Sequence, residues 1–319
     1  MKVYQKFWET IQQVNSIAIY SHIQTDGDAV CSSLALYNVL TSMGKKVDVF
    51  FGAPLPKYLE FLPNLERLNK KTMSKYQAVI ALDCNNADRL GQAKYTFFKY
   101  AISLQIDHHP NNPNFAKTVN IVQTDASSTC EIVFDVCAYK NVHISKETAQ
   151  YLLVGLLTDT GGFMFNNTKA CVLEKASKLL KILDTDISAL TLPLFQSVTL
   201  NEFTLNKIAM QKLELIQNDS IAILILTQKD FQQSHMLLEN AKGVIQIGMQ
   251  LASVKVMVLA SEDPEGFYRI SYRSKGDIDI SKCARVFGGG GLKNASGCRI
   301  YSKDPVFIKN EILRSLEVL

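Results

Sequence analysis

The first half of the chain alternates short apolar runs with segments of helical spacing. Mostly apolar runs, each typical of a buried strand, cover residues 16–21, 47–51, 78–82 and 101–106. Segments 29–43, 129–139 and 145–157 repeat apolar residues at helical spacing. Short strands separated by helices predict an α/β domain with a mostly parallel sheet and helices on both of its faces.

The pattern changes at residues 185–204, which hold a proline and several Ser and Thr residues without a clear period. We therefore expect a first domain at 1–184, a linker at 185–204 and a smaller second α/β domain at 205–319. The pattern after 205 predicts helices at 205–217, 236–250 and 305–318 and strands at 220–226, 254–260 and 266–273, and a glycine run lies at 288–291.

The composition narrows the classes of protein that fit this pattern. The 319 residues are 47% hydrophobic and carry a net charge of +4, which is ordinary for a soluble globular protein and too weakly basic for one that coats nucleic acid. The longest apolar runs are far shorter than the ~20 residues of a membrane helix. Seven scattered cysteines without a C-x-x-C pair favour reduced thiols, so we expect a cytoplasmic protein without a membrane anchor.

Acidic residues and histidines follow the predicted strands of the first domain. The segment His22–Asp28 (HIQTDGD) comes after the first strand, Asp83 after the third, and Asp107-His108-His109 after the fourth, while Asp159 follows the helix at 145–157. Ligands of parallel sheets bind at the carboxyl ends of the strands. Imidazole and carboxylate groups without thiolates suit Mn²⁺, Fe²⁺, Co²⁺ or Mg²⁺, and two such ions would neutralise the gathered acids.

Taken singly, each of these residues has an ordinary structural explanation. His22 can be a satisfied polar residue at a strand end, Asp83 a helix cap, and Asp159 a turn residue before two glycines. The metal interpretation rests on the common sheet edge, because separate structural explanations would have to hold independently at every one of these positions.

Together the motifs resemble the four motifs of the DHH phosphoesterase family in order and spacing. The second half adds Tyr272-Arg273-Ser274, Phe287–Gly291 (FGGGG) and Asn294–Gly297 (NASG), which look like the DHH-associated domain. The length and the two-domain layout are similar to the branch of oligoribonucleases that are also 3′-phosphoadenosine 5′-phosphate phosphatases. The resemblance implies that 1–184 is the catalytic domain, that 205–319 is the substrate-binding domain, and that the active site lies in the cleft between them.

This resemblance implies a role for each position. One divalent ion would be held by His22, Asp26 and Asp83, and the other by Asp28, Asp83, His108 and Asp159. Asp83 would then bridge two ions, with Mn²⁺ the first choice and Mg²⁺ or Co²⁺ the alternatives. The catalytic positions would be His109, facing the substrate phosphate, and Asp107, orienting the histidine pair. Family members often form dimers, so a homodimer is a further expectation.

Other residues are candidates for binding the substrate. Ser127 and Ser128 precede a helix whose N-terminal amides are suited to a phosphate, although an ordinary N-cap with Glu131 explains them as well. In the second domain, Arg273 can pair with a phosphate, and the backbone of Gly289, Gly290 and Gly291 can approach one closely.

One position departs from the family pattern. The histidine that usually follows the glycine run is replaced by Leu292. The leading expectation is a metal-dependent phosphoesterase that hydrolyses short RNA or DNA oligonucleotides or a phosphorylated mononucleotide. The alternatives are a cyclic-dinucleotide phosphodiesterase, an inorganic pyrophosphatase, or a nucleotide-binding protein with weak or no turnover because of Leu292.

Overall fold

Five parallel strands form the sheet of the N-terminal unit, in the order β2-β1-β3-β4-β5. They are β1 (Ser16–Tyr20), β2 (Lys46–Phe50), β3 (Ala78–Leu82), β4 (Ile102–Asp107) and β5 (Val119–Val122). The chain runs outward from β1 to β2 on one side and from β3 to β5 on the other. The carboxyl ends of β1 and β3 therefore flank the switch point at which ligands bind in such sheets.

The structure is a computed structural model that describes residues 2–52, 54–238 and 243–319. It divides into two units, Met1–Ser197 and Val198–Leu319. The division falls inside the segment 185–204 that the sequence predicts as a linker. Within the described residues, no helix is both long enough and apolar enough to cross a membrane.

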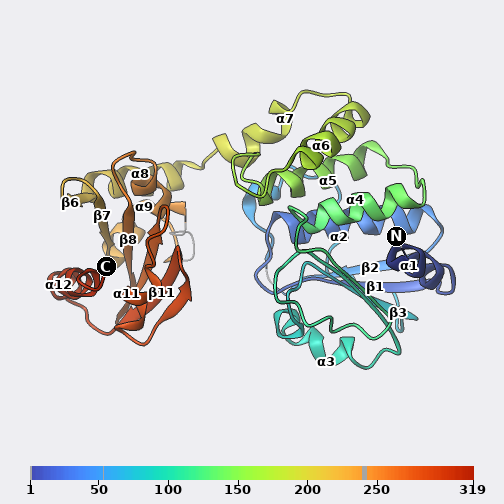
Figure 1. Cartoon of the computed structure of the whole chain (residues 1–319), viewed down its shortest axis with the longest axis horizontal. Helices are drawn as coiled ribbons and strands as arrows, with labels where there is room; N and C mark the ends of the chain where they lie inside the picture. Colours follow the sequence, from blue (N-terminus) through green and yellow to red (C-terminus); the bar gives the residue numbers. More distant parts are fainter. Residues whose placement is uncertain (1, 53, 239–242) are drawn as a thin grey trace. The chain divides into compact units, whose positions relative to one another are not determined.

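Helices cover both faces of the N-terminal sheet, as the sequence predicts. The helices are α1 (Lys2–Gln12), α2 (Gly27–Ser42), α3 (Ala93–Phe97), α4 (Thr129–Tyr139), α5 (Lys146–Asp159), α6 (Ala170–Leu183) and α7 (Ser188–Thr191). Short turns are η1 (Lys57–Leu59), η2 (Leu65–Arg67), η3 (Ala87–Leu90) and η4 (Leu192–Gln196). In Figure 1, α2, α4 and α5 lie over one face and the short α3 lies on the other.

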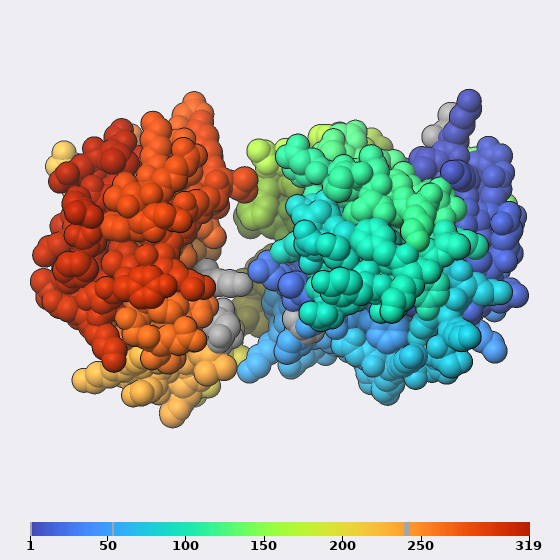
Figure 2. All heavy atoms as spheres, turned by 90° about the horizontal axis from the view of Figure 1, so that it is seen from below, coloured from blue at the N-terminus to red at the C-terminus, as the bar shows by residue number. Residues whose placement is uncertain are grey.

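The two faces have separate apolar cores because successive strand residues point to opposite sides. On β1, Ile17 and Ile19 pack under the α2–α4–α5 layer, whereas Ala18 and Tyr20 pack with Phe97 of α3. The sequence interpretation did not include helix α1. This helix buries Phe7 and Trp8 in the same core as Ile17 and Ile19. Its residues form part of the outer surface of this unit (dark blue in Figure 2).

The C-terminal unit is built on a mixed sheet in the order β10-β11-β9-β8-β7-β6. Its strands are β6 (Glu214–Ile216), β7 (Ile221–Leu226), β8 (Val256–Asp263), β9 (Phe267–Ser274), β10 (Gly290–Leu292) and β11 (Ala295–Ile300). Its helices are α8 (Leu200–Lys212), α9 (Gln228–Ser234), α10 (Ile245–Met249), α11 (Ser281–Arg285) and α12 (Pro305–Leu316). One core packs against α11 and α12, and a second includes residues of α8, α9 and α10.

Two expected helices of this unit are wrong in detail, and the glycine run, for which the sequence predicts no element, is partly a strand, since Gly290–Leu292 pair with β11. The helix expected at 205–217 begins at Leu200, because Thr199 and Glu202 form a capping box, and residues 214–216 form β6. The helix expected at 236–250 is observed only as α10 at 245–249, and residues 239–242 lie outside the described residues.

Candidate active site

The segment that joins β1 to α2 contributes His22, Asp26 and Asp28. Asp26 is the N-cap of α2: its Oδ1 accepts a hydrogen bond from the Ala29 amide at 3.0 Å, and its Oδ2 lies 3.5 Å from His22 Nε2. Asp28 lies in the first turn of α2 and is fully buried. Gly27 is required between them, because a Cβ there would lie 2.5 Å from the side chain of Thr158 on α5.

Asp83 follows β3, and its two carboxylate oxygens face different histidines. Oδ2 lies 3.3 Å from His22 Nε2, and Oδ1 lies 3.6 Å from His108 Nε2. The backbone of Asp83 has φ +59°, in the left-handed region that aspartate tolerates better than most residues. This buried carboxylate therefore lies between the residues that follow β1 and those that follow β4.

The end of β4 holds the acid–histidine triplet. Asp107 is fully buried, and its Oδ1 lies 2.9 Å from His109 Nδ1 while its Oδ2 accepts a hydrogen bond from the His109 amide at 3.2 Å. Asn112 also donates to Oδ2, at 2.6 Å. Asp107 thus fixes the orientation of the His109 ring through Nδ1, so Nε2 of that ring is not bonded to Asp107. His108 Nε2 lies 3.2 Å from Asp159 Oδ2, at the last residue of α5.

The N-terminus of α4 holds Asp28. The amides of Thr129 and Cys130 donate to Asp28 Oδ2 and Oδ1 at 2.6 and 2.9 Å, and the Thr129 hydroxyl donates to Asp83 Oδ1 at 2.9 Å. Helix N-termini stabilise negative charge. The sequence predicts that the amides at this helix end bind a substrate phosphate. In the structure, the Thr129 and Cys130 amides donate to Asp28 instead.

The two serines before α4 differ in what they bind. Ser128 is the N-cap, and its Oγ accepts from the Glu131 amide at 3.1 Å; the Ser127 amide donates to Glu131 Oε2 at 2.6 Å. The N-cap explanation with Glu131 is therefore confirmed. Ser127 Oγ is buried and has no hydrogen-bond partner within the described residues.

Sequence reasoning missed three polar residues around this cluster: Asn112, Thr129 and Asn167. Asn167 donates from Nδ2 to the carbonyl oxygens of Ser127 and Asp159, at 3.2 and 3.0 Å, and so ties the loop before α4 to the end of α5. Residue type alone does not reveal such contacts. The one usable signal is that Asn112 lies three residues after His109 and Asn167 lies eight residues after Asp159.

Burial and mutual repulsion set the protonation of the acids in the protein without metal. Burial, then the charges of Asp83 and Asp26, raises the pKa of Asp159 to about 8. Burial, then Asp83 and Asp159, raises the pKa of Asp28 well above its usual range. Burial opposes ionisation of Asp83 as well, but the His22 hydrogen bond and the nearby histidines lower its pKa. One acid of the cluster thus ionises readily while two neighbours retain protons.

The pKa values of the three histidines in the cluster do not all shift in the same direction. Burial would lower the pKa of His22, but its hydrogen bonds with Asp26 and Asp83 raise it to about 9. Burial lowers the pKa of His108, which favours the neutral imidazole that a metal ion needs. The hydrogen bond with Asp107 raises the pKa of His109, which favours the protonated form of the ring.

Among the described residues, three groups of side chains bring potential metal-ligand atoms within 4.8 Å of one another. These groups are His22, Asp26 and Asp83; Asp28, His108 and Asp159; and Asp83, His108 and His109. Each contains imidazole nitrogen and carboxylate oxygen, the donor set that suits Mn²⁺, Co²⁺ and Fe²⁺. The residues present therefore fit divalent ions: the first group has the same residues as one implied ligand set, and the second has three of the four residues of the other, without Asp83.

The residues expected to bind substrate in the C-terminal unit lie on neighbouring strands. Arg273 on β9 is directly opposite Ala295 on β11, and Ala295 is opposite Leu292 on β10. The Arg273 guanidinium donates to the Tyr272 carbonyl at 2.9 Å and has no carboxylate partner within the described residues. Leu292 is 76% exposed, so this side chain is free to contact a ligand.

The glycine run allows two strands to approach closely. A Cβ at Gly289 would lie 2.2 Å from the Gly297 carbonyl oxygen, and one at Gly291 would lie 2.5 Å from that of Ala295. Tyr268 and Tyr272 are fully buried, so strand packing rather than base stacking is their role.

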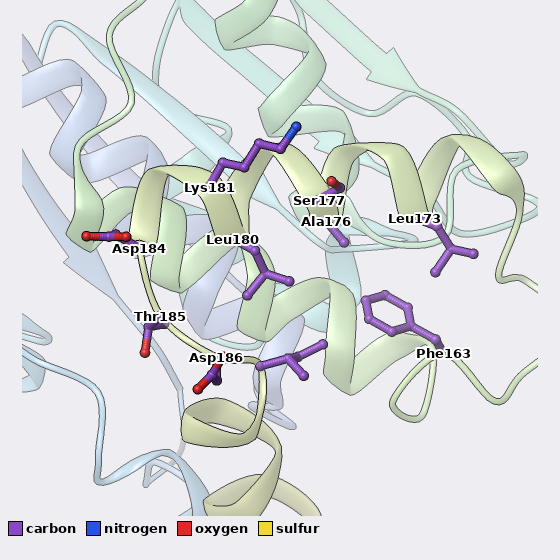
Figure 3. A pocket seen from close by; sticks show the side chains of 10 residues that line it. Phe163, Leu173, Ala176, Ser177, Leu180, Lys181, Asp184, Thr185 and Asp186 are labelled. Atoms are coloured by element: carbon purple, nitrogen blue, oxygen red, sulfur yellow. The ribbon is translucent and has the colours of Figure 1, made fainter.

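A groove of ≈ 940 Å³ in the N-terminal unit lies elsewhere, along α6 and the turn that follows it. Figure 3 shows its lining, which includes Phe163, Leu180, Lys181, Asp184 and Asp186. It contains neither histidine nor cysteine and none of the residues of the acid–histidine cluster. The chemistry of the cluster, and not the size of this groove, identifies the candidate active site.

The fold and the cluster are those of a DHH-type phosphoesterase domain, and comparison with known proteins agrees. Residues 16–156 match the DHH family, N-terminal domain, and residues 236–314 match the DHHA1 domain. The chain belongs to the DHH family.

Individual relatives span almost the whole chain. It is 28% identical over 302 residues to a probable bifunctional oligoribonuclease and PAP phosphatase NrnA of Streptococcus mutans, covering 95% of each protein. It is 28% identical to the bifunctional oligoribonuclease and PAP phosphatase NrnA of Bacillus subtilis, covering 97% of this chain and 96% of that protein. The crystal structure of an exopolyphosphatase-related protein from Bacteroides fragilis superposes with a TM-score of 0.88 at 25% identity, covering 99% and 96%.

Proposed function

We propose that this protein is a divalent-metal-dependent phosphoesterase that hydrolyses short oligonucleotides and 3′-phosphoadenosine 5′-phosphate. The observation that carries the proposal is the position of Asp83, whose two oxygens face the histidines of two separate ligand groups. The substrates are those in the names of the Streptococcus and Bacillus relatives.

In this proposal His22, Asp26 and Asp83 hold one ion, and Asp28, Asp83, His108 and Asp159 hold the other. Two ions bound there would supply an activated water and would neutralise the phosphate as charge builds in the transition state. We propose Mn²⁺ as the ion, since a mixed imidazole and carboxylate set suits it, with Mg²⁺ or Co²⁺ as alternatives.

His109 contacts the substrate phosphate in this account. Asp107 engages Nδ1 of its ring and raises its pKa, which leaves a protonated Nε2 to donate a hydrogen bond to a phosphate oxygen. Such donors contribute most when they meet charge that develops in the transition state. Asp107 acts through His109 by fixing the orientation and protonation of the ring.

We propose two further side chains as substrate contacts. Ser127 Oγ has no hydrogen-bond partner within the described residues, and the partly buried guanidinium of Arg273 donates to the Tyr272 carbonyl but has no carboxylate partner there. The exposed Leu292 beside the Gly289–Gly291 run extends the same strand surface. A substrate role for Ser128 stays a prediction, because its hydroxyl already caps α4.

The alternative functions differ in their products. A cyclic-dinucleotide phosphodiesterase would linearise its substrate, and a nucleotide-binding protein with weak turnover would hold a nucleotide without releasing product. The test is incubation of a labelled dinucleotide and of 3′-phosphoadenosine 5′-phosphate with the protein and Mn²⁺. Release of mononucleotide and of inorganic phosphate supports the proposal; tight binding without either product supports the binding protein.

A further inference from the structure

Two arginines of the C-terminal unit, Arg269 and Arg299, are not used by the function proposed above. A pocket of ≈ 510 Å³ is lined by both of them together with Gly288, Gly289 and Tyr301. Tyr301 is 74% exposed. Guanidinium groups, glycine backbone and an exposed aromatic ring are together the chemistry that binds a nucleotide phosphate and its base.

Arg269 on β9 and Arg299 on β11 are directly opposite each other in the sheet register. Like charges at directly opposite positions of an antiparallel pair are destabilising. One of the two charges is compensated, because Arg269 donates from Nε and Nη2 to Asp263 Oδ2 at 2.8 and 2.6 Å. An anion in the pocket would relieve the repulsion that remains.

Arg299 is the cation of this pair that is left for a ligand. Within the described residues it has no carboxylate partner in a salt bridge, and its guanidinium lies over the ring of Phe267 at 5.0 Å from the centroid. The aromatic ring holds the cation electrostatically, and guanidinium N–H groups are the ones that bind phosphate. Asp263 interacts with Arg299 as well as with Arg269, so one carboxylate faces two guanidinium groups and a net positive charge remains for an anion.

Arg269 and Arg299 lie on the same face of the sheet as Arg273. Residues four apart on a strand share a face, and Arg269 and Arg299 are four residues along β9 and β11 from Arg273 and Ala295. At ~3.4 Å per residue the Cα atoms of the two basic positions are separated by about 14 Å. One phosphate cannot contact both positions, whereas a longer oligonucleotide carries several.

We infer that the Arg269–Arg299 pocket is a subsite for a second phosphate of an oligonucleotide substrate, with the adjoining base stacked on Tyr301. The inference rests on the proposed function and deepens it, because it assigns a preference among substrate lengths. An unphosphorylated dinucleotide has one internal phosphate and would not use the subsite, whereas a pentanucleotide would use it.

The test compares wild-type protein with Arg299→Gln on an unphosphorylated dinucleotide and on a pentanucleotide. A hydrogen bond to a charged group contributes enough that its loss should raise KM for the pentanucleotide by about tenfold or more. KM for the dinucleotide, and kcat on both substrates, should not change. Arg67→Gln is the matched control, because Arg67 is also an exposed arginine over an aromatic ring, that of Tyr37, but in the N-terminal unit.

Binding measured without turnover separates this inference from the proposed function. With EDTA present, anisotropy of a labelled pentanucleotide at several salt concentrations should give a log K versus log[salt] slope that is smaller by about 0.7 in Arg299→Gln, as for one lost phosphate contact. Tyr301→Ala should weaken pentanucleotide binding without changing that slope. If Arg299→Gln changes dinucleotide and pentanucleotide KM equally, or if neither KM nor the salt slope changes, the subsite does not exist. If wild-type protein hydrolyses neither substrate, the proposed function fails while the binding measurement still decides the subsite.

Discussion

The hydroxyl of Thr129 donates a hydrogen bond to Asp83 Oδ1 at 2.9 Å, and both side chains are almost completely buried. The amide of the same Thr129 donates to Asp28 Oδ2 at 2.6 Å. One residue at the start of α4 thus orients the proposed bridging ligand of both ions and a proposed ligand of the second ion. Groups that orient metal ligands commonly alter metal affinity by 10–100-fold when they are lost.

Thr129→Val should therefore weaken binding of Mn²⁺ by about tenfold or more. Valine keeps the shape of threonine but cannot donate to Asp83, whereas Thr129→Ser keeps the hydroxyl and should restore most of the affinity. Calorimetric titration of the chelated proteins measures this directly. Equal affinities for the valine and serine variants would mean that the hydrogen bond has no role in the metal site.

Asp83→Ala should be among the most damaging single changes, because it removes a ligand from both ions. We expect kcat on a dinucleotide to fall by several powers of ten. Asp88→Asn is the control, since Asp88 lies in the turn that follows the same strand and its 82% exposed side chain pairs with Lys94. Near-normal turnover in Asp83→Ala would show that another residue bridges the ions.

The stability of the metal-free protein should fall as pH rises from about 4 to 9. The pKa of Asp159 is raised to about 8 in the folded protein, so the folded state binds more protons than the unfolded state between about pH 4 and 8. His22, raised to about 9, contributes stability that is lost as pH rises from about 6.5 through 9. The measurement is Tm against pH after exhaustive chelation.

Mn²⁺ should reverse this trend, because protons and the ion compete for the same carboxylates. The increase in Tm on adding Mn²⁺ should thus be larger at pH 8 than at pH 6, and Asp159→Asn should flatten the pH dependence of the metal-free protein. A Tm of the metal-free wild type that rises between pH 5 and 8 would contradict the assigned protonation of the cluster.

Leu292→His should raise kcat/KM on short oligonucleotides without changing metal affinity. The side chain at 292 is 76% exposed and lies two strands from Arg273, so an imidazole there has room to donate to a substrate phosphate. A donor of this kind is worth on the order of 10²–10³ in rate. Equal or slower rates in a folded variant, on a dinucleotide and on 3′-phosphoadenosine 5′-phosphate, would show that the missing imidazole does not limit this protein.

The sequence predicted the parts of the fold that depend on local pattern. Alternating apolar strands and helices gave the parallel sheet, and the order of acids and histidines after them gave the members of the cluster. The capping box at Thr199 and the short strand β6 were missed, because apolar spacing at 205–217 continues across a helix end that hydrogen bonds define. Pairing partners of a three-residue strand such as β10 are not encoded in its own residues.

The contacts that hold the site together were less predictable than its members. Asp28 is bonded to the amides of Thr129 and Cys130, more than one hundred residues away, and no local signal marks such a pair. The sequence fits Ser128 equally well as a phosphate ligand and as a helix cap. The capping role follows from the hydrogen bond that the Glu131 amide donates to Ser128 Oγ in the folded chain. Residue type indicates which chemistry is possible, whereas tertiary contacts decide which groups remain free.

The central claim is that two ions, bridged by Asp83, are needed for hydrolysis. The most direct test titrates Mn²⁺ into exhaustively chelated protein, at concentrations well above the dissociation constants, while mononucleotide release from a labelled dinucleotide is followed. The account predicts no turnover without metal and full turnover only when two equivalents per chain have been added. Full activity after chelation, or activity that is complete at one equivalent, would contradict it.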